Sequence, residues 1–360
     1  MIRYLILAFV LLPLMASACS VPVFRYGLEH WLPDAFEAVV FHRGELTSAQ
    51  GEAVDVLRGS GLNLELKTID LADEANAEWV EAWKALKGES LPWMVVRPNQ
   101  RTGINWLRFS RALTTENATL LVDSPARREF TKRIAAGQSA VWLLLKSGDT
   151  AKDDAAAQQL KERIKYLHSV LKLPKLDATD IANGLISVAP EDLRLEFSLL
   201  EIARDDPAEE LFIKMLLGTE SDLVELDEPI AFPLFGRGRA LYALVGKGIN
   251  SETIDQAAIY LTGSCSCEVK EQNPGVDLLM MADWEEIVKP PKTETNVQVQ
   301  MTNTVATNLV ADNLPEVVTI DGGAVKKKPQ PVDRASGRRW MFVAIIGIIG
   351  VIALLSRRGS

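Results

Sequence analysis

The sequence has few residues of the kinds on which catalytic and metal sites depend. Only three cysteines and three histidines occur among 360 residues. The histidines, His30, His42 and His168, lie far apart and lack the spacing of metal ligands or of a Ser-His-Asp arrangement. We therefore interpret them as surface or hydrogen-bonded side chains, and we predict no metal site built on them and no cofactor.

The sequence also lacks an excess of positive charge. Its net charge is -9 and its pI is near 5.1. Binding of nucleic acid requires a clustered cationic surface, so we predict no nucleic-acid partner. Hydrophobic residues make up 48% and charged residues 24% of the chain. These values are typical of folded globular protein and leave room for two domains.

The N-terminus has the composition of a secretion signal. Arg3 supplies a positive charge, Leu5 to Met15 form an apolar core, and Ala16 to Ala18 are small residues of the kind that precede a cleavage site. We therefore predict a signal peptide over residues 1–18 and a mature chain that begins at Cys19. The body of the protein is then exported.

A second apolar run lies near the C-terminus. The residues from Trp340 to Leu355 carry no charge, and arginine pairs flank the run on both sides. Sixteen residues at about 1.5 Å each give roughly 24 Å, and flanking arginines can snorkel to the interfaces of a core of about 30 Å. No later chain could cover a buried core helix here. We therefore predict a transmembrane helix over residues 340–356 and a cytoplasmic tail over 357–360.

Signal and span together predict the location of the protein. The body would face the periplasm from the bacterial cytoplasmic membrane, and the membrane is its first predicted partner. A C-terminal sorting signal that is cut after export is the minor alternative, since the chain lacks an L-P-x-T-G or P-E-P motif before the span. Residues 289–339 are rich in Pro, Lys, Thr and Asn without an apolar period, so we predict a flexible linker of roughly 40 Å average span.

Cys19 has two predicted fates. A cysteine directly after the cleavage site resembles the lipobox of bacterial lipoproteins, which implies a diacylglyceryl group on its thiol. Ala16 stands where those proteins usually carry Leu, and Ala16 with Ala18 also satisfies ordinary signal-peptidase cleavage. Lipidation of Cys19 would leave Cys265 and Cys267 as an even pair, as is usual in exported proteins.

The body alternates strand-like and helix-like segments, which predicts an α/β fold. Its first part, residues 35–138, has strand patterns at 37–41, 62–71, 93–97 and 104–109 and helix patterns at 47–58, 73–87 and 126–136. This order resembles the thioredoxin fold, in which a proline, commonly cis, precedes the third strand; Pro92 matches that proline. The family's C-x-x-C at the first helix is missing, because residues 44–48 contain no cysteine. The resemblance therefore implies a fold without ordinary thiol-disulfide exchange.

The pattern repeats in residues 139–288. Strands are expected at 140–145, 193–200 and 240–245, and helices at 151–172, 206–217 and 251–261. Pro233 matches the proline of the second unit. We therefore predict two tandem thioredoxin-like domains, 35–138 and 139–288, preceded by an N-terminal tether over 19–34 and followed by the linker and one transmembrane helix.

Two short segments of the second domain contain glycine, arginine and cysteine motifs. Gly236 to Arg239, G-R-G-R, could hold an anion, but no helix start follows at the required distance, so we favour a hairpin turn. The segments F-G-R-G-R-A-L and C-S-C-E-V-K-x-x-N-P-G resemble those of an uncharacterised group of bacterial secreted, membrane-anchored proteins. That resemblance implies no activity.

The C-x-C pair, Cys265 and Cys267, has three interpretations. A disulfide that stiffens the turn after the last helix is favoured, because secreted proteins usually use paired cysteines structurally. A strained and therefore oxidising disulfide is the second. Two thiolates for a soft metal are the third, although two ligands alone do not complete a site.

Two classes of function follow. We favour a non-enzymatic interaction module that presents redox-inactive thioredoxin-like domains to an unknown protein partner in an envelope complex. The alternative is a thiol redox or soft-metal-handling protein that acts through Cys265 and Cys267. The missing C-x-x-C favours the first class and the C-x-C keeps the second open, so the sequence does not distinguish an enzyme from a non-enzymatic module.

Overall fold

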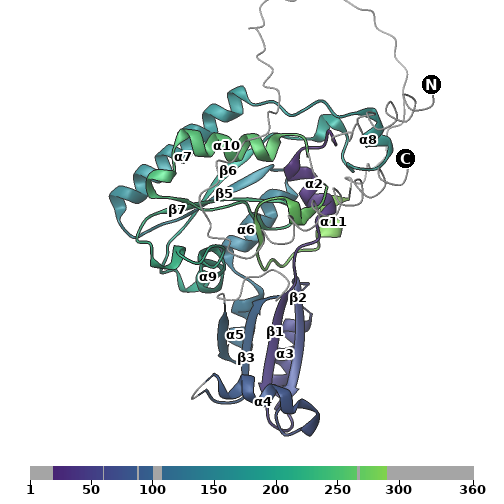
Figure 1. Cartoon of the computed structure of the whole chain (residues 1–360), viewed down its shortest axis with the longest axis vertical. Coiled ribbons are helices and arrows are strands. Elements are labelled where there is room, and N and C mark those ends of the chain that lie inside the picture. Colours follow the sequence, from purple (N-terminus) through teal and green to yellow (C-terminus); the bar gives the residue numbers. More distant parts are fainter. Residues whose placement is uncertain (1–18, 60, 87–88, 100–107, 266–267, 290–360) are drawn as a thin grey trace, which may run out of the picture. The chain divides into compact units, whose positions relative to one another are not determined.

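The computed structural model describes residues 19–59, 61–86, 89–99, 108–265 and 268–289. These residues form two mixed β-sheets flanked by helices (Figure 1). Within these ranges no helix has the length and apolar character that a membrane crossing requires. The predicted signal peptide and transmembrane helix, and the predicted linker beyond Lys289, lie outside the described residues.

The first sheet has four strands in the order β2-β1-β3-β4. β1 and β2 are parallel, while β3 is antiparallel to both of its neighbours. Its strands are β1 (Phe36–His42), β2 (Leu64–Asp70), β3 (Trp93–Pro98) and β4 (Phe109–Ala112). Its helices are α3 (Ser48–Arg58), the 3-10 turn η1 (Glu74–Asn76), α4 (Ala77–Lys84) and α5 (Thr115–Val122). We call this part, residues 35–122, the first subdomain.

The second sheet has the order β10-β8-β7-β5-β6, and β9 also pairs with β7. Its strands are β5 (Ala140–Leu145), β6 (Phe197–Ile202), β7 (Ile230–Phe235), β8 (Arg239–Ala240), β9 (Leu244–Val245) and β10 (Val276–Asp277). Its α-helices are α2 (Val23–His30), α6 (Pro125–Ala135), α7 (Thr150–Val170), α8 (Ala178–Ala182), α9 (Glu210–Leu217), α10 (Ser251–Thr262) and α11 (Trp284–Val288). Short 3-10 turns are η3 (Pro190–Asp192), η4 (Pro207–Glu209), η5 (Leu223–Glu225), η6 (Gly246–Gly248) and η7 (Lys270–Gln272). We call residues 123–289 together with 19–34 the second subdomain.

The two sheets share one connectivity. In each, a first strand, a helix and a parallel second strand are followed by two antiparallel strands, so that β6-β5-β7-β8 repeats the order β2-β1-β3-β4. The α/β class expected from the sequence is thus confirmed, and both mixed sheets are consistent with a thioredoxin-like fold.

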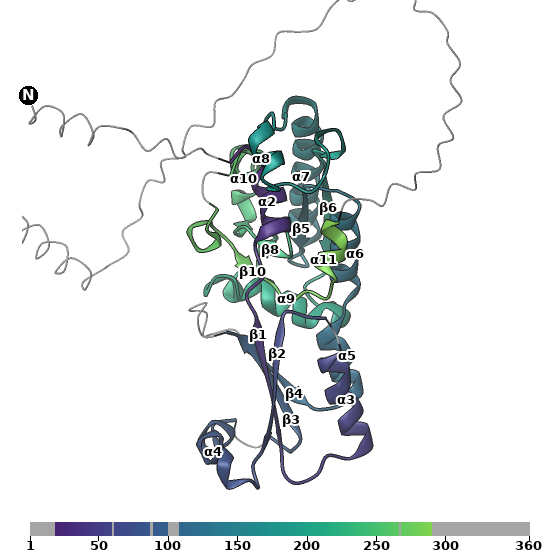
Figure 2. The same cartoon turned by 90° about the vertical axis from the view of Figure 1, so that its right-hand side faces the viewer.

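Side-chain alternation explains how each sheet is covered. In β1, Ala38 and Val40 face the cluster that contains α3 and α5, whereas Val39 and Phe41 face the side of α4. Figure 2 shows α3 with α5 on one side of this sheet and α4 on the other. β5 is apolar at every position because both of its faces are buried. One apolar cluster includes residues of both subdomains.

Capping side chains mark the starts of three helices that the sequence predicted. Thr47 begins α3 through a capping box with Gln50, and Asn250 does the same for α10 with Thr253. Ser124 caps α6, whose first residue is a proline.

Several boundaries differ from the sequence prediction. The residues interpreted as a tether, 19–34, contain the buried helix α2, which packs on β7 and α10. α6 packs on β5 and β6 and so belongs to the second subdomain, whereas α5, which was not predicted, completes the first. The strand expected at 240–245 is interrupted into β8 and β9.

Pro233 does not precede its strand as predicted. It lies inside β7, opposite Trp142 of β5. Pro229 is the residue directly before β7, whereas Pro92 directly precedes β3, and its peptide bond with Leu91 is cis. Pro92 therefore occupies the place predicted for it, and the position predicted for Pro233 is held by Pro229.

Candidate functional site

The start of α3 is where a thioredoxin-like unit would carry its reactive cysteines. Here the Thr47 hydroxyl accepts a hydrogen bond from the Gln50 N–H at 3.4 Å, and the Gln50 side chain accepts one from the Thr47 N–H at 3.0 Å. Neither side chain is a thiol, and both are engaged in capping the helix. This helix start can therefore not exchange disulfides.

The loop before α3 is held by a carboxylate from β2. Asp70 accepts hydrogen bonds from the Ala72 N–H at 2.8 Å and the Gly44 N–H at 3.0 Å. These two backbone hydrogen bonds lower the pKa of Asp70. Phe41 of β1 pairs with Trp93 of β3, so the loop after β1 and Pro92, directly before β3, lie at the same end of the sheet. The Asp70 carboxylate therefore fixes the backbone of this loop.

The equivalent helix start in the second subdomain is also used structurally. The Asp153 carboxylate accepts hydrogen bonds from the Ser147 N–H at 2.7 Å, the Ser147 hydroxyl at 2.8 Å and the Gly148 N–H at 3.0 Å. Asp149 caps α7. Lys152 forms an ion pair at 2.7 Å with Glu228, which precedes Pro229. The acidic groups at this end of the sheet are therefore paired with backbone N–H groups, a hydroxyl or Lys152.

The three histidines are hydrogen-bonded to the backbone, as the sequence suggested. His42 Nδ1 lies 2.8 Å from the Gly44 carbonyl, and His30 Nε2 lies 2.9 Å from the Leu185 carbonyl. His168 Nε2 accepts the Phe197 N–H at 2.8 Å. Each imidazole ring thus forms a hydrogen bond with the backbone of a loop or strand.

The segment singled out at Gly236 to Arg239 contacts the last turn of α2. Arg237 donates to the carbonyls of Leu28 at 2.8 Å and Glu29 at 3.1 Å, and it pairs with Glu285 at 2.7 Å. Its guanidinium group therefore binds this chain's own acceptors. The hairpin interpretation of Gly236 to Arg239 is confirmed, since β7 turns into β8 here.

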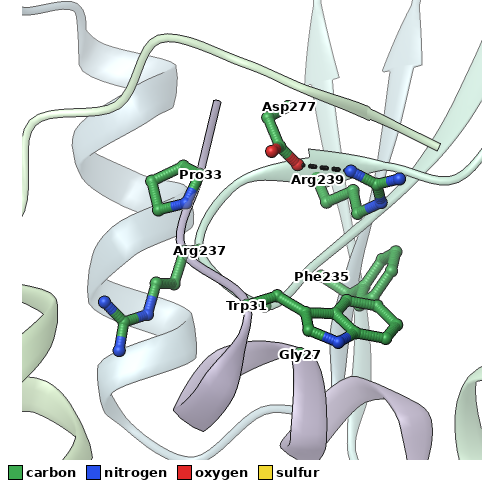
Figure 3. Close-up of a pocket in the computed structure, with 8 residues that line it drawn as sticks. Gly27, Trp31, Pro33, Phe235, Arg237, Arg239 and Asp277 are labelled. Carbon is green, nitrogen blue, oxygen red and sulfur yellow. Dashed lines mark hydrogen bonds and ion pairs between the residues drawn. The ribbon is translucent and has the colours of Figure 1, made fainter. Parts of the chain in front are cut away.

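Arg239 enters a buried ionic network. Its guanidinium group pairs with Asp277 at 2.7 Å and donates to the carbonyls of Asn273 and Pro274 at 3.1 Å each. Figure 3 shows Arg239 facing Asp277 above the rings of Trp31 and Phe235. These two rings lie edge to face, with centroids 6.3 Å apart.

Lys270 extends this network to the N-terminal segment. Its ammonium group lies 2.8 Å from Asp277 and 2.6 Å from Asp34. Burial by itself would lower the pKa of Lys270, but attraction and hydrogen bonds from Asp277 and Asp34 raise it. Asp277 also accepts the Asp34 N–H at 2.7 Å. Asp277 thus joins three segments that are far apart in the sequence.

Close packing surrounds the network. A Cβ on Gly275 would lie 2.7 Å from the Ala240 carbonyl oxygen, and a Cβ on Gly238 would lie 2.4 Å from Met280 Cγ. The void beside Trp31 and Arg239 measures about 10 Å³, room for about one water molecule. The residues of these segments therefore form a structural junction rather than a substrate pocket.

Two of the three cysteines lie in the core of the second subdomain. The side chains of Cys19 and Cys265 are only 3% and 1% exposed. The Cys265 N–H donates to the Val21 carbonyl at 2.9 Å, which draws the N-terminal segment alongside the end of α10. Tyr26 packs in the same apolar cluster as the two cysteines, and burial together with Glu268 raises its pKa to about 12.

Cys267 lies outside the described residues, so the pairing predicted between Cys265 and Cys267 stays a prediction. No group of three or more potential metal ligands gathers within the described ranges. Cys19, for which lipidation is one of the two predicted fates, is buried, and this burial raises the pKa of its thiol. A lipid on this sulfur would have to displace the side chain from the core.

The sequence did not identify Asp34 and Asp277 as partners of Arg239 and Lys270. The sequence does hold a charge pattern that points to this network. Lys270 and Asp277 lie on either side of N-P-G, and the residues directly after Asp277 are apolar. Comparison with protein-family models and with curated proteins finds no match for the chain.

Proposed function

We propose that this protein is an extracytoplasmic interaction module built on two redox-inactive thioredoxin-like units and tethered to the bacterial cytoplasmic membrane by its C-terminal span. The observation that carries the proposal is the chemistry of the residues at the starts of α3 and α7, the first helix of each thioredoxin-like unit. Thr47 with Gln50 caps α3, and Asp149 with Asp153 caps α7 and fixes the loop before it, and none of these four residues is a cysteine.

The repeated strand order supports the thioredoxin-like part of the proposal. A fold of this type presents a helix start, a proline loop and an exposed sheet edge to polypeptides, and these features remain when the thiols are lost. The ion pairs and backbone hydrogen bonds at both edges favour a rigid binding surface over a site for proton or electron transfer.

The alternative, thiol redox or soft-metal chemistry through Cys265 and Cys267, has less support. Redox-active and metal-binding thiols are typically accessible and held as thiolates. Cys265 is 1% exposed within an apolar cluster. Burial of this kind favours a structural role.

Capture of partners from the native membrane tests the proposal. The tagged full chain is cross-linked in intact cells, extracted with detergent and compared with a tagged protein that carries only the signal, linker and span. The proposal predicts an envelope protein that is enriched with the full chain and not with the control. Equal recovery with both would contradict an interaction module.

A further inference from the structure

The mature chain predicted to begin at Cys19 starts within the second subdomain. Cys19 is 3% exposed. Two residues further on, the Val21 carbonyl accepts a hydrogen bond from the Cys265 N–H at 2.9 Å, and the Val23 N–H donates to the Gly263 carbonyl at 3.0 Å. The first residues of the mature chain are thus paired with the chain at the end of α10, and the nitrogen of Cys19 lies against the folded body.

Asp180 of α8 holds the residue after Cys19. Its Oδ2 accepts the Ser20 N–H at 2.7 Å and the Ser20 hydroxyl at 2.6 Å. The N–H of Asp177, which directly precedes α8, donates to the Ser20 hydroxyl at 2.7 Å. These three hydrogen bonds fix Ser20 against the start of α8, and they bring the Cys19 nitrogen close to the Asp180 carboxylate.

The Asp180 carboxylate is buried without a cation. Asp180 is 9% exposed. Among the described residues its donors are the N–H and the hydroxyl of Ser20, which are neutral and both bond to Oδ2. Oδ1 has no donor there, and it is not one of the unpaired atoms that are closed off from solvent. A buried carboxylate costs free energy unless a cation or a full set of donors compensates its charge. Asp180 therefore presents an accessible oxygen for one more donor.

The titratable groups near Cys19 are neutral or negative. Burial, and then the charges of Asp180 and Glu268, raise the pKa of the Cys19 thiol, so it is protonated at neutral pH. Tyr26 packs in the same cluster, and its pKa of about 12 keeps it neutral as well. The Asp177 carboxylate caps α8 at the same place. Such surroundings favour a cation at Cys19 and oppose a second negative charge.

Signal cleavage at the predicted bond places a cation here. Hydrolysis of the bond between Ala18 and Cys19 adds the oxygen of water to the Ala18 carbonyl carbon and leaves the Cys19 nitrogen as an α-ammonium group. This nitrogen is three bonds from the Ser20 nitrogen, at most about 3.7 Å away by standard bond lengths, so it lies within about 6.4 Å of Asp180 Oδ2. Opposite charges about 4–6 Å apart favour the charged forms of both groups.

We infer that Asp180 binds the α-ammonium group that signal cleavage creates at Cys19. In the precursor this nitrogen is a neutral amide, so the ion pair forms only after the signal peptide is removed. The pair then locks the N-terminal segment, and with it α2, onto β7 and α10. The inference rests on the signal peptide and export that the proposed function includes, and it requires neither a partner nor a reactive thiol.

The pKa of the Cys19 α-amino group tests the inference in the full chain, exported and purified in detergent. The pH dependence of acetylation of the N-terminal peptide, followed by mass spectrometry, gives this pKa. We expect it at least about one unit above the ordinary value of about 7.7–8.0, and Asp180→Asn should lower it by about one unit, which is about tenfold faster acetylation below the pKa. Asp55→Asn, at a 71% exposed carboxylate on α3, is the control and should leave it unchanged. An ordinary pKa, or a raised one that Asp180→Asn does not lower, would overturn the inference.

An N-terminal extension tests the same pair from its other side. Two alanines inserted between Ala18 and Cys19 restore an amide at Cys19 and move the ammonium group roughly 7 Å away. Urea unfolding is measured at pH 6.5, below the ordinary α-amino pKa, where a raised pKa contributes its full stability. The extension should raise the unfolding equilibrium constant about tenfold in the unchanged chain and less than about twofold in Asp180→Asn. Equal effects in both would overturn the inference. If Asp180→Asn fails to fold by circular dichroism, the extended chain decides, because a raised α-amino pKa in it would exclude the pair.

The mass of the N-terminal peptide separates this inference from the proposed function. A first residue other than Cys19, or an acylated Cys19 nitrogen, overturns the inference and leaves the interaction module standing. A free Cys19 amino group whose raised pKa depends on Asp180 supports the inference even when membrane capture recovers no partner, a result that contradicts the module alone.

Discussion

Pro229 directly precedes β7 as Pro92 directly precedes β3. Ile230, the residue after Pro229, pairs with Leu145 at the end of β5, and Trp93, the residue after Pro92, pairs with Phe41 near the end of β1. The two prolines thus enter corresponding strands at corresponding edges. Each lies at the end of the sheet where the neighbouring strand, β1 or β5, leads into a capped helix, α3 or α7, and this arrangement is the basis of the proposed redox-inactive module.

Asp277 should be the most sensitive member of the buried network. Asp277→Asn leaves the cationic groups of Arg239 and Lys270 buried with a neutral partner, so we expect the free energy of unfolding to fall by about 3–5 kcal/mol. Asp34→Asn is the control, because Asp34 is 44% exposed, and it should cost no more than about 1 kcal/mol. Urea unfolding of both variants measures the difference. Equal losses would show that Asp277 is not the centre of the junction.

Gly275 and Gly148 form a matched pair for the packing of the junction. Both have positive φ, +117° and +95°, so alanine strains the backbone at either position. Only the Cβ at Gly275 meets an atom, the Ala240 carbonyl oxygen at 2.7 Å. We expect Gly275→Ala to lose about 1–3 kcal/mol more stability than Gly148→Ala in thermal unfolding. Similar losses in both would argue against a tightly packed junction.

Glu37 should make the first subdomain sensitive to acid. Burial raises its pKa, but hydrogen bonds from Lys67 and Arg97 outweigh burial and lower the pKa below the ordinary value of 4.5. A lowered carboxyl pKa contributes stability that is present above pH 4.5 and is lost as the pH falls through the folded-state pKa. Glu37→Gln should therefore lower stability at pH 7 and flatten its loss below pH 4.5.

The pH profile of unfolding, followed by tryptophan fluorescence, checks this. Glu81→Gln, at an exposed pair with Lys84, serves as the control and should leave the profile unchanged. A profile of Glu37→Gln as steep as that of the unchanged chain would show that other carboxyl groups cause the acid sensitivity.

The sulfur of Cys19 should carry no lipid after export. Its side chain is 3% exposed and packs in the same cluster as Cys265, so a diacylglyceryl group would require the segment 19–22 to leave the core. We expect no incorporation of labelled palmitate in the bacterial host and an N-terminal peptide mass without lipid. Labelling that disappears in Cys19→Ser would establish lipidation and show that the N-terminal segment rearranges in the mature protein.

Local signals made much of the fold predictable. The apolar run of β5 and the caps of α3 and α7 are written in adjacent residues, and the helices begin where these signals place them. The repeated order of strands and helices followed from the alternation of periods. These features require no knowledge of distant contacts.

Long-range pairing made the rest unpredictable. α2 has only eight residues, and its start is fixed by a hydrogen bond of the Val23 N–H to the Gly263 carbonyl. Pro229 and Pro233 lie four residues apart in one apolar segment, and only the register against β5 shows which of them precedes the strand. The network of Arg239 and Asp277 likewise depends on the pairing of β8 with β10.

Insulin reduction by the purified full chain, with dithiothreitol as the electron source, tests the central claim most directly. The comparison is a variant in which Cys19, Cys265 and Cys267 are all replaced by Ser. A redox-inactive module predicts the same slow rate for both proteins, equal to that of dithiothreitol alone. A rate that exceeds this background and is lost in the triple Ser variant would contradict the claim and make the protein a thiol oxidoreductase.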